Sequence, residues 1–267
     1  MYSSVITLTT DFGYKDPFVG IMKGVILKIN PLVRIVDISH EVVPQNIMEA
    51  SFMIEKSFKS FPQKTIHVGV VDPGVGSERR PILISAEYHY FVGPDNGIFS
   101  FIYNLSKHFT VIHITAKHYF LPDLSSTFHG RDIFAPVAAW LSKGVDINNF
   151  GEPIRDYAKI PASFPKKLSE RIMEGEVIYI DRFGNLITNI SANNINELTR
   201  NYPDKKLKVM IRDIEAPFKT HYSEATDDVL YSLIDSFDSL ELFVNKGNAS
   251  TIFDINVGEK VIVTITK

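Results

Sequence analysis

The first 142 residues of the chain alternate between short β-branched runs and longer runs in which apolar residues recur at helical spacing. This alternation restricts the fold more than any other feature, because it is typical of a parallel sheet covered by helices. The pattern predicts strands at 5–9, 33–38, 66–71, 82–85, 91–92 and 110–114, and helices at 17–29, 46–58, 98–105 and 132–142. We therefore expect residues 1–160 to form an N-terminal α/β domain with a mostly parallel sheet.

The pattern changes after about residue 155, where proline and polar residues replace the apolar periodicity. Residues 161–172 are expected to form a linker, since prolines interrupt regular structure there. The short apolar runs beyond it are separated by turns such as Phe183-Gly184-Asn185 and Lys246-Gly247-Asn248. This spacing predicts a C-terminal all-β, barrel-like domain over residues 173–267.

Charge and composition narrow the possible partners of the chain. The net charge of -3 provides no basic surface for nucleic acid, and no apolar run reaches the length of a membrane span. The absence of cysteine excludes disulfides and thiolate chemistry. The N-terminal residues lack the basic start and long apolar stretch of a signal peptide, so we expect a cytoplasmic protein.

Three acids follow β-branched runs in the first half of the chain: Asp11, Asp37 and Asp72. The carboxyl ends of parallel strands meet at one edge of a sheet, where ligands usually bind. Asp11 is suited either to accept hydrogen bonds from a ribose diol or to cap the helix that follows it, whereas Asp37 is expected to be structural. Asp72 lies in a proline-glycine turn, where an acid either presents its charge to a ligand or satisfies turn amides.

A polar triad is a second candidate for chemistry. Arg79 follows the Asp72 turn, and His129 lies in a glycine-containing loop just before the helix predicted at 132–142. Together with Asp72, these side chains are able to hold a water molecule or hydroxide. The arginine would stabilise the anion, while the histidine or the acid managed its proton. Taken alone, a histidine in such a loop is more often a surface or hydrogen-bonding residue than a catalyst.

A third polar cluster lies in the second domain. Asp181 and Asn185 straddle a glycine turn, so they are suited either to bind a zwitterionic amino-acid group or simply to close a hairpin. The histidines show no metal-ligand spacing, and the sequence contains no phosphate-binding loop, dinucleotide-binding motif or nucleophile elbow. We therefore expect neither a metal nor a nicotinamide cofactor.

The polar motifs are most informative when they are taken together in their order along the chain. They are Thr10-Asp11-Phe12-Gly13, Asp37-Ile38-Ser39-His40 with Pro44, Val71-Asp72-Pro73-Gly74-Val75-Gly76, Gly93-Pro94-Asp95-Asn96-Gly97, Phe128-His129-Gly130-Arg131-Asp132 and Asp181-Arg182-Phe183-Gly184-Asn185. This set resembles the S-adenosyl-L-methionine hydroxide adenosyltransferases, adenosine-forming hydrolases related to bacterial fluorinases and chlorinases. The resemblance spans nearly the whole chain.

The resemblance implies a reaction and an assembly. The reaction is hydrolysis of S-adenosyl-L-methionine to adenosine and L-methionine, by in-line attack of water or hydroxide on ribose C5′, with no cofactor. The family fold is an N-terminal α/β domain followed by a C-terminal β-barrel. Family members assemble as homotrimers, with active sites between neighbouring subunits.

The resemblance also implies roles for individual residues. Asp72, Arg79 and His129 would bind the attacking water. Either Arg79 or its neighbour Arg80 could fill the arginine position, and the spacing from Asp72 favours Arg79. Asp11 would hold the ribose hydroxyls. The other implied substrate contacts are Asp181, Asn185 and Ser236 for the methionine portion, and Phe128 and Tyr222 beside the adenosine.

Two alternatives to a hydrolase are a related halogenase and a non-catalytic protein that binds S-adenosyl-L-methionine or adenosine. The halogenases resemble this chain but carry an altered residue where it has Gly130, and they lack the acid and the histidine at the positions of Asp72 and His129. An acid beside the nucleophile repels a halide ion but assists a water molecule. A protein that only binds has no need of a water-activating triad. Both arguments favour hydrolysis.

Overall fold

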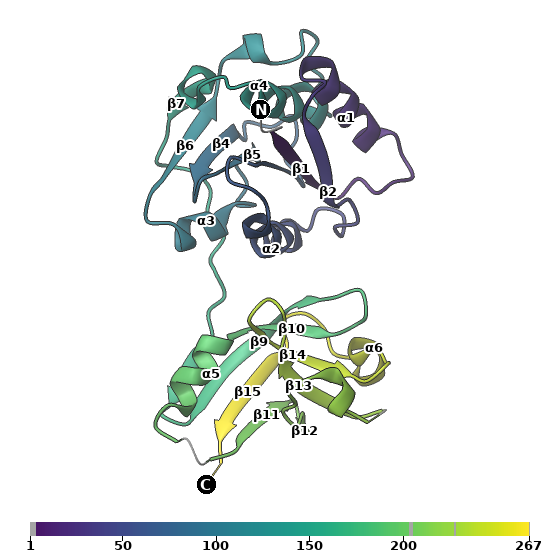
Figure 1. The fold of residues 1–267 in the computed structure, drawn as a ribbon, viewed down its shortest axis with the longest axis vertical. Coiled ribbons are helices and arrows are strands. Elements are labelled where there is room, and N and C mark those ends of the chain that lie inside the picture. The colour runs from purple at the N-terminus through teal and green to yellow at the C-terminus, as the bar shows by residue number, and fades with distance from the viewer. Residues whose placement is uncertain (1–3, 203–204, 227, 267) are drawn as a thin grey trace. The chain divides into compact units, whose positions relative to one another are not determined.

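The computed structural model describes residues 4–202, 205–226 and 228–266 (Figure 1). The chain divides into two compact units, Met1–Ala162 and Ser163–Lys267, and each is described by itself. Within the described ranges, no helix is long and apolar enough to cross a membrane.

The first unit contains a seven-stranded sheet in the order β2-β1-β3-β5-β4-β6-β7. Its strands are β1 (Val5–Thr10), β2 (Arg34–Ser39), β3 (Ile66–Val70), β4 (Pro81–Ala86), β5 (His89–Pro94), β6 (Phe109–Ile114) and β7 (Gly151–Pro153). The pairs β2–β1, β1–β3 and β3–β5 are parallel, whereas β5–β4, β4–β6 and β6–β7 are antiparallel. The sheet is therefore mixed, and the prediction of a mostly parallel sheet is wrong for its second half.

A tight hairpin between β4 and β5 causes this difference. Glu87 and Tyr88 connect the two strands with φ angles of +50° and +63°, a backbone typical of the two-residue turns that join antiparallel neighbours. Such turns usually contain asparagine or glycine, and neither occurs at these two positions. Without that turn signal, the sequence pattern does not reveal the antiparallel pairing.

Helices cover both faces of this sheet, and they occur where the sequence pattern predicts them. They are α1 (Phe18–Ile29), α2 (Ile47–Ser57), α3 (Ser100–Leu105) and α4 (Ala135–Ser142), with a π-helical segment at Gly130–Phe134 and 3-10 turns at Phe58–Ser60, Lys117–Tyr119 and Ile147–Phe150. Helices α1 and α4 lie over one face of the sheet (Figure 1). Met22 of α1 and Val137 of α4 are buried in the core on that face. Helices α2 and α3 bury Ile54 and Ile102 against the other. The two cores hold the strand ends in place.

The second unit is an antiparallel sheet that nearly closes into a barrel. Its strands are β8 (Lys166–Ser169), β9 (Ile172–Ile180), β10 (Leu186–Ser191), β11 (Leu207–Ile211), β12 (Ile214–Glu215), β13 (Leu230–Ile234), β14 (Ser239–Val244) and β15 (Lys260–Ile265). Their order is β12-β11-β15-β9-β10-β14-β13, and β8 pairs with β9. Ser232 of β13 donates its backbone N–H to Pro217 and accepts from Lys219, just after β12. These bonds join the two ends of the sheet.

The second unit also contains short helices, so it is not purely β as predicted. Helix α5 (Ala192–Thr199) is capped by Ser191, and helix α6 (Ala249–Phe253) by Asn248. With eight and five residues, both are too short for an apolar period to stand out in the sequence. The segment 161–172, expected to be a linker, contains β8, whose four residues are all exposed. A 3-10 turn lies at Tyr222–Glu224.

Candidate functional site

Two of the three strand-end acids lie at one edge of the first sheet. Strands β1 and β3 are parallel neighbours, with Thr10 opposite Val70. Asp11 directly follows Thr10, and Asp72 comes two residues after Val70. Both acids therefore lie just beyond the carboxyl ends of adjacent strands, at the edge where α/β proteins commonly bind ligands.

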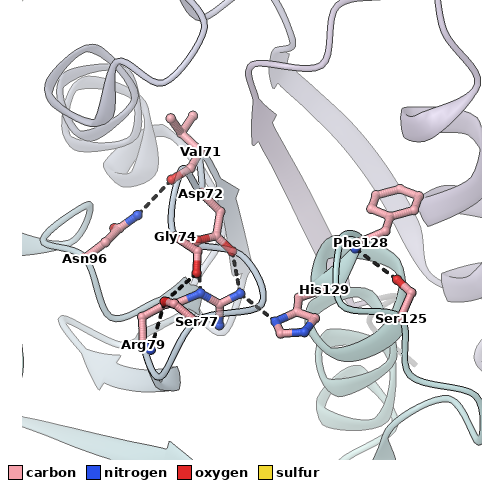
Figure 2. Close-up of polar contacts among 9 residues, drawn as sticks. All are labelled: Val71, Asp72, Gly74, Ser77, Arg79, Asn96, Ser125, Phe128 and His129. Carbon is pink, nitrogen blue, oxygen red and sulfur yellow. Dashed lines mark hydrogen bonds and ion pairs between the residues drawn. The ribbon is translucent and has the colours of Figure 1, made fainter.

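Arg79 connects Asp72 to His129 (Figure 2). Its Nε donates a hydrogen bond to Asp72 Oδ1 at 2.9 Å, and its Nη2 donates to Asp72 Oδ2. The same Nη2 donates to His129 Nδ1 at 2.7 Å. The side chains of Arg79 and Asp72 are only 9% and 6% exposed, and a two-point contact of this kind fixes both position and orientation. The structure thus brings together all three members of the predicted triad.

The guanidinium of Arg79 has one further buried donor. Its Nη1 has no hydrogen-bond partner among the described residues. A buried donor of a charged group is costly unless a ligand or water satisfies it. The ring of Phe134 lies against the guanidinium, with its centroid 5.2 Å from Arg79 Cζ. Nη1 is therefore a donor that the triad can offer to an oxygen atom of a ligand.

His129 is a neutral imidazole in this arrangement. A guanidinium only donates hydrogen bonds, so His129 Nδ1 must accept from Arg79 and the ring proton is assigned to Nε2. Burial lowers the pKa of His129 and the charge of Arg79 lowers it further, against the opposing effects of Asp72, Asp132 and a hydrogen bond with the Ser125 backbone. The imidazole therefore offers an N–H donor at Nε2, while Asp72 carries the anionic oxygens of the triad.

The two loops that carry the triad approach each other closely at Gly76. This residue has a φ of +78°, and a Cβ there would overlap the carbonyl oxygen of Ser126, so glycine is required. The loop that carries His129 is ordered by Asp132, which is fully buried and accepts from the Ser125 N–H at 2.8 Å. The Ser125 hydroxyl in turn accepts from the Phe128 N–H at 3.0 Å (Figure 2). These contacts hold His129 within reach of the guanidinium.

Asp11 and Phe128 lie at the same edge of the sheet as the triad. Asp11 Oδ2 accepts from the backbone N–H of Gln45 at 2.8 Å, and the residue is partly exposed. Phe128 packs edge-on against Phe12, next to Asp11, with ring centroids 5.8 Å apart. The five site residues predicted in the first unit therefore lie at one edge of its sheet.

A cavity of about 710 Å³ in the second unit contains the other four predicted site residues, and this volume is in the usual range for small-molecule sites. Asp181 and Asn185 come from the β9–β10 hairpin, and Ser236 from the β13–β14 hairpin. Tyr222 belongs to the 3-10 turn before β13. These four residues, which are up to 55 positions apart in the sequence, thus line one cavity.

Asp181 closes the β9–β10 turn and also lines this cavity. Its Oδ1 accepts from the backbone N–H groups of Phe183 at 2.9 Å and Asn185 at 2.8 Å, and its Oδ2 accepts from the Asn185 amide at 3.1 Å. Gly184 has a φ of +85°, and a Cβ there would overlap the side chain of Asn248. The hairpin-turn and ligand-binding interpretations are therefore compatible, because the turn fixes two residues that line the cavity.

Glu241 lines the same cavity but is absent from the sequence-based prediction. It is 3% exposed in β14, a strand whose six residues are all buried. The Tyr222 hydroxyl donates to Glu241 Oε1 at 2.8 Å. Burial raises the pKa of Glu241 to about 7, with Asp235 and Asp181 acting in the same direction. A single acid within an apolar strand is the sequence signal for this residue, since unpaired acids are almost never fully buried.

The lining of the cavity is acidic overall. Asp181, Asp235 and Glu241 contribute to it, and Lys246 is the basic residue among the lining positions. Across the described parts of the chain, no group of three or more His, Asp and Glu side chains is arranged to hold a metal ion. The lining suits an organic cation such as an ammonium or sulfonium group.

Both units match models of one protein family. The model described as SAM hydroxide adenosyltransferase N-terminal domain matches residues 6–151, and the C-terminal domain model matches residues 175–262. A relative from Methanocaldococcus jannaschii named (R)-S-adenosyl-L-methionine hydrolase is 37% identical, over 96% of this chain and 94% of that protein. A protein from Actinoplanes sp. named fluorinase is 24% identical, over 98% of this chain and 97% of that protein.

A solved structure has the same fold along nearly the whole chain. It is the crystal structure of an uncharacterized conserved protein from Thermotoga maritima, with a TM-score of 0.89 and 33% sequence identity. The match covers 97% of this chain and 99% of that one. Taken with the two domain models, these similarities show that the chain belongs to the SAM hydroxide adenosyltransferase family.

Proposed function

We propose that this protein hydrolyses S-adenosyl-L-methionine to adenosine and L-methionine. A water oxygen attacks ribose C5′ opposite the sulfur, the C5′–S bond breaks with its electron pair going to sulfur, and the water loses one proton. The observation that carries this proposal is the Asp72–Arg79–His129 arrangement, in a chain with a relative named as a hydrolase of this substrate.

The substrate itself makes this reaction feasible without a cofactor. Its positively charged sulfur leaves as a neutral thioether, so the carbon–sulfur bond needs no further activation. The protein has to place one water molecule in line with that bond, shield it from bulk solvent and accept its proton. We propose that side chains alone perform these tasks.

Each member of the triad has its own task in this proposal. Asp72 accepts the proton of the attacking water, because the neutral His129 already uses Nδ1 to accept from Arg79. Arg79 holds the other two side chains and offers Nη1 to the water oxygen. His129 Nε2–H is a second donor that orients the water.

The remaining residues bind the parts of the substrate that do not react. In this proposal Asp11 accepts from the ribose hydroxyls and Phe128 packs beside the adenosine. The acidic lining of the second-unit cavity supports binding of the cationic methionine portion there. Asp181, Asn185 and Ser236 are assigned to that portion, and Tyr222 to the adenosine side.

The same observations disfavour halogenation. A halide bound beside C5′ would be repelled by Asp72, which carries the negative charge of the triad. The identity to the hydrolase relative, 37%, also exceeds the 24% identity to the fluorinase. Hydrolysis is therefore the function that the site supports best. We also propose a cytoplasmic homotrimer whose active sites are completed between neighbouring subunits, as the family resemblance implies.

The test is to incubate the purified protein with S-adenosyl-L-methionine in ¹⁸O-labelled water and identify the products by mass spectrometry. The expected products are methionine and adenosine with the label at the 5′-hydroxyl. Formation of 5′-chloro-5′-deoxyadenosine at a comparable rate in excess chloride would favour a halogenase. Tight binding without either product would favour a protein that only binds. Light scattering of the same sample tests the trimer.

A further inference from the structure

The turn Pro94-Asp95-Asn96-Gly97 contacts both ends of the loop 72–79, which carries two members of the triad and is called the triad loop below. Asn96 Nδ2 donates to the carbonyl of Val71 at 2.8 Å, immediately before this loop (Figure 2). The backbone N–H of Asp95 donates to the carbonyl of Arg80 at 2.8 Å, immediately after it. The proposed function gives this turn no role.

We infer that Asn96 is a positioning residue for the reaction, an inference that rests on the proposed hydrolysis. It fixes the base of the triad loop, so that Asp72 is held where the attacking water must lie. Asp95 fixes the other end of the same loop. The turn after β5 therefore acts as a clamp that sets the place of the triad relative to the sheet.

The hydrogen bond from Asn96 to the Val71 carbonyl lies just beyond the end of strand β3. Strand β3 ends at Val70, so Val71 lies beyond it, yet this residue is fully buried. A buried carbonyl needs a hydrogen-bond partner, and the Asn96 amide provides it. Asn96 is itself oriented, because its Oδ1 accepts from the backbone N–H of Ile98 at 3.2 Å. The amide thus has one defined direction, toward the residue before Asp72.

The bonds of Asp95 explain which of two adjacent arginines joins the triad. Arg80 donates through Nε at 3.1 Å and through Nη2 at 2.8 Å to Asp95 Oδ2. Asp95 Oδ1 accepts from the backbone N–H of Ala158 at 2.7 Å, and the Asp95 side chain is only 5% exposed. Arg80 is therefore held at the clamp, and Arg79 pairs with Asp72.

The triad loop has internal bonds, but these do not fix its place on the sheet. Val75 N–H donates to the Asp72 carbonyl at 3.2 Å, and Ser77 N–H donates to the Gly74 carbonyl at 3.1 Å. If the loop shifted as a unit, Asp72 and Arg79 would stay paired with each other. What would change is their position against the ribose carbon. A loss of the clamp should therefore lower the rate of the chemical step more than substrate affinity.

The test is Asn96→Asp, which keeps the acceptor for Ile98 N–H but removes the donor to Val71. We expect kcat to fall about 10- to 100-fold, the range associated with a displacement near 1 Å in an active site, while KM changes less than about threefold. Asn96→Ala, which removes both bonds without adding a charge, should show the same separation of kcat from KM. The matched control is Asn104→Asp, which alters an exposed amide that donates to the Ser100 carbonyl within α3. The control should leave both constants unchanged.

The NMR signals of the His129 ring give a readout that does not depend on turnover. Asn96→Asp should shift these ring nitrogen signals, because Arg79 donates to Nδ1, and Asn104→Asp should not. The clamp is refuted if the wild-type protein hydrolyses S-adenosyl-L-methionine and both Asn96 variants retain its kcat. It is equally refuted if kcat, 1/KM and thermal stability fall together. If the wild-type protein makes no adenosine, the proposed function fails, and an unmoved His129 signal in both Asn96 variants then refutes the clamp separately.

Discussion

Asp72 in the first unit and Glu241 in the second are both shielded from solvent, but their partners differ in charge. Both oxygens of Asp72 accept from the permanent cation Arg79. Glu241 accepts from the neutral hydroxyl of Tyr222, and it makes no ion pair within the described ranges. Burial raises the pKa of Glu241 to about 7, with Asp235 and Asp181 acting in the same direction. Asp72 thus has a counter-ion within the protein, whereas Glu241 has none among the described residues.

This difference separates two ways of using a buried carboxylate. A carboxylate with a fixed counter-ion keeps its place through a reaction cycle, which suits a group that handles the proton of water. A carboxylate without one is stabilised as an anion when a cationic ligand arrives. S-adenosyl-L-methionine carries both an ammonium and a sulfonium group. We therefore expect changes at Asp72 to affect turnover and changes at Glu241 to affect binding.

The largest effect is expected for Asp72→Asn. This change keeps the shape of the side chain but removes its charge and its ability to take a proton from water. We expect kcat to fall about 10³-fold, within the usual range for loss of a general base, with KM changed less than about threefold. Steady-state kinetics of adenosine release would measure both. The matched control is Asp146→Asn, an exposed acid that caps a 3-10 turn and should leave both constants unaltered. If kcat and 1/KM fell by equal factors, Asp72 would affect binding as well as turnover, and the proposed difference between Asp72 and Glu241 would be wrong.

Sequence reasoning groups Asp72, Arg79 and His129 because each lies in a motif that the sequence shows, although Arg79 and His129 are 50 positions apart. The acid follows a β-branched strand, the arginine lies seven positions later, and the histidine is marked by the glycine beside it. The position of Asp11 next to these residues follows from parallel pairing of β1 with β3. Motif order along the chain therefore already indicates this group.

The Glu241 region is different, because its properties arise from packing. The carboxyl group is defined by burial in β14 and by a tyrosine from a separate 3-10 turn. The sheet pairing in the first unit shows the same limit. The β4–β5 hairpin turns on Glu87 and Tyr88, which carry no turn signature in the sequence. Features without a motif or turn signature, whether set by packing as at Glu241 or by backbone geometry as at Glu87 and Tyr88, are the ones that sequence reasoning misses.

An intermediate effect is expected for Glu241→Gln. Glutamine keeps a hydrogen bond to Tyr222 but cannot become the counter-ion of a bound cation. We expect KM to rise about 50-fold, in the range found for hydrogen bonds to charged groups, with kcat reduced less than about threefold. Isothermal titration with a non-reactive analogue that keeps the ammonium group would measure the affinity directly.

The pH dependence gives this prediction a sharper form. Glu241 has a pKa near 7 in the free protein, and a cation favours its ionised form, so binding below pH 7 must release a proton. Wild-type affinity should therefore fall as the pH drops below 7, about tenfold per unit once the acid is fully protonated. Glu241→Gln should abolish this slope. Tyr222→Phe retains the carboxyl group and serves as the control that keeps a slope. If the affinity of Glu241→Gln depended on pH as steeply as that of the wild-type protein, Glu241 would not be the group that causes the pH dependence.

The smallest effect is expected in stability, where the two units should respond to pH in opposite directions. In the first unit, His67 is 1% exposed and bonds through Nδ1 to Thr7 at 2.8 Å and through Nε2 to His89 at 3.2 Å. Burial lowers the pKa of His67 to about 3, with His89 acting in the same direction, from an ordinary value of 6.5. Its contribution is complete above pH 6.5 and is lost as the pH falls toward 3. At pH 5.5 the expected cost is about 1.4 kcal/mol, or tenfold in the opening constant.

Glu241 has the opposite sign, because its pKa is raised from 4.5 to about 7. Its contribution is complete below pH 4.5 and is lost as the pH rises through 7, so acid should favour the second unit. Native-state hydrogen exchange of the full chain at pH 5.5 and 7.5, corrected for intrinsic rates, would follow strands β1 and β3 separately from β13 and β14. Glutamine does not titrate, so the acid-induced loss of protection in the first unit should be about tenfold smaller in His67→Gln than in the wild-type protein. Protection in the second unit should be the same in both proteins. If acid lowers protection in both units by the same factor, the predicted opposite response of the two units to pH is wrong.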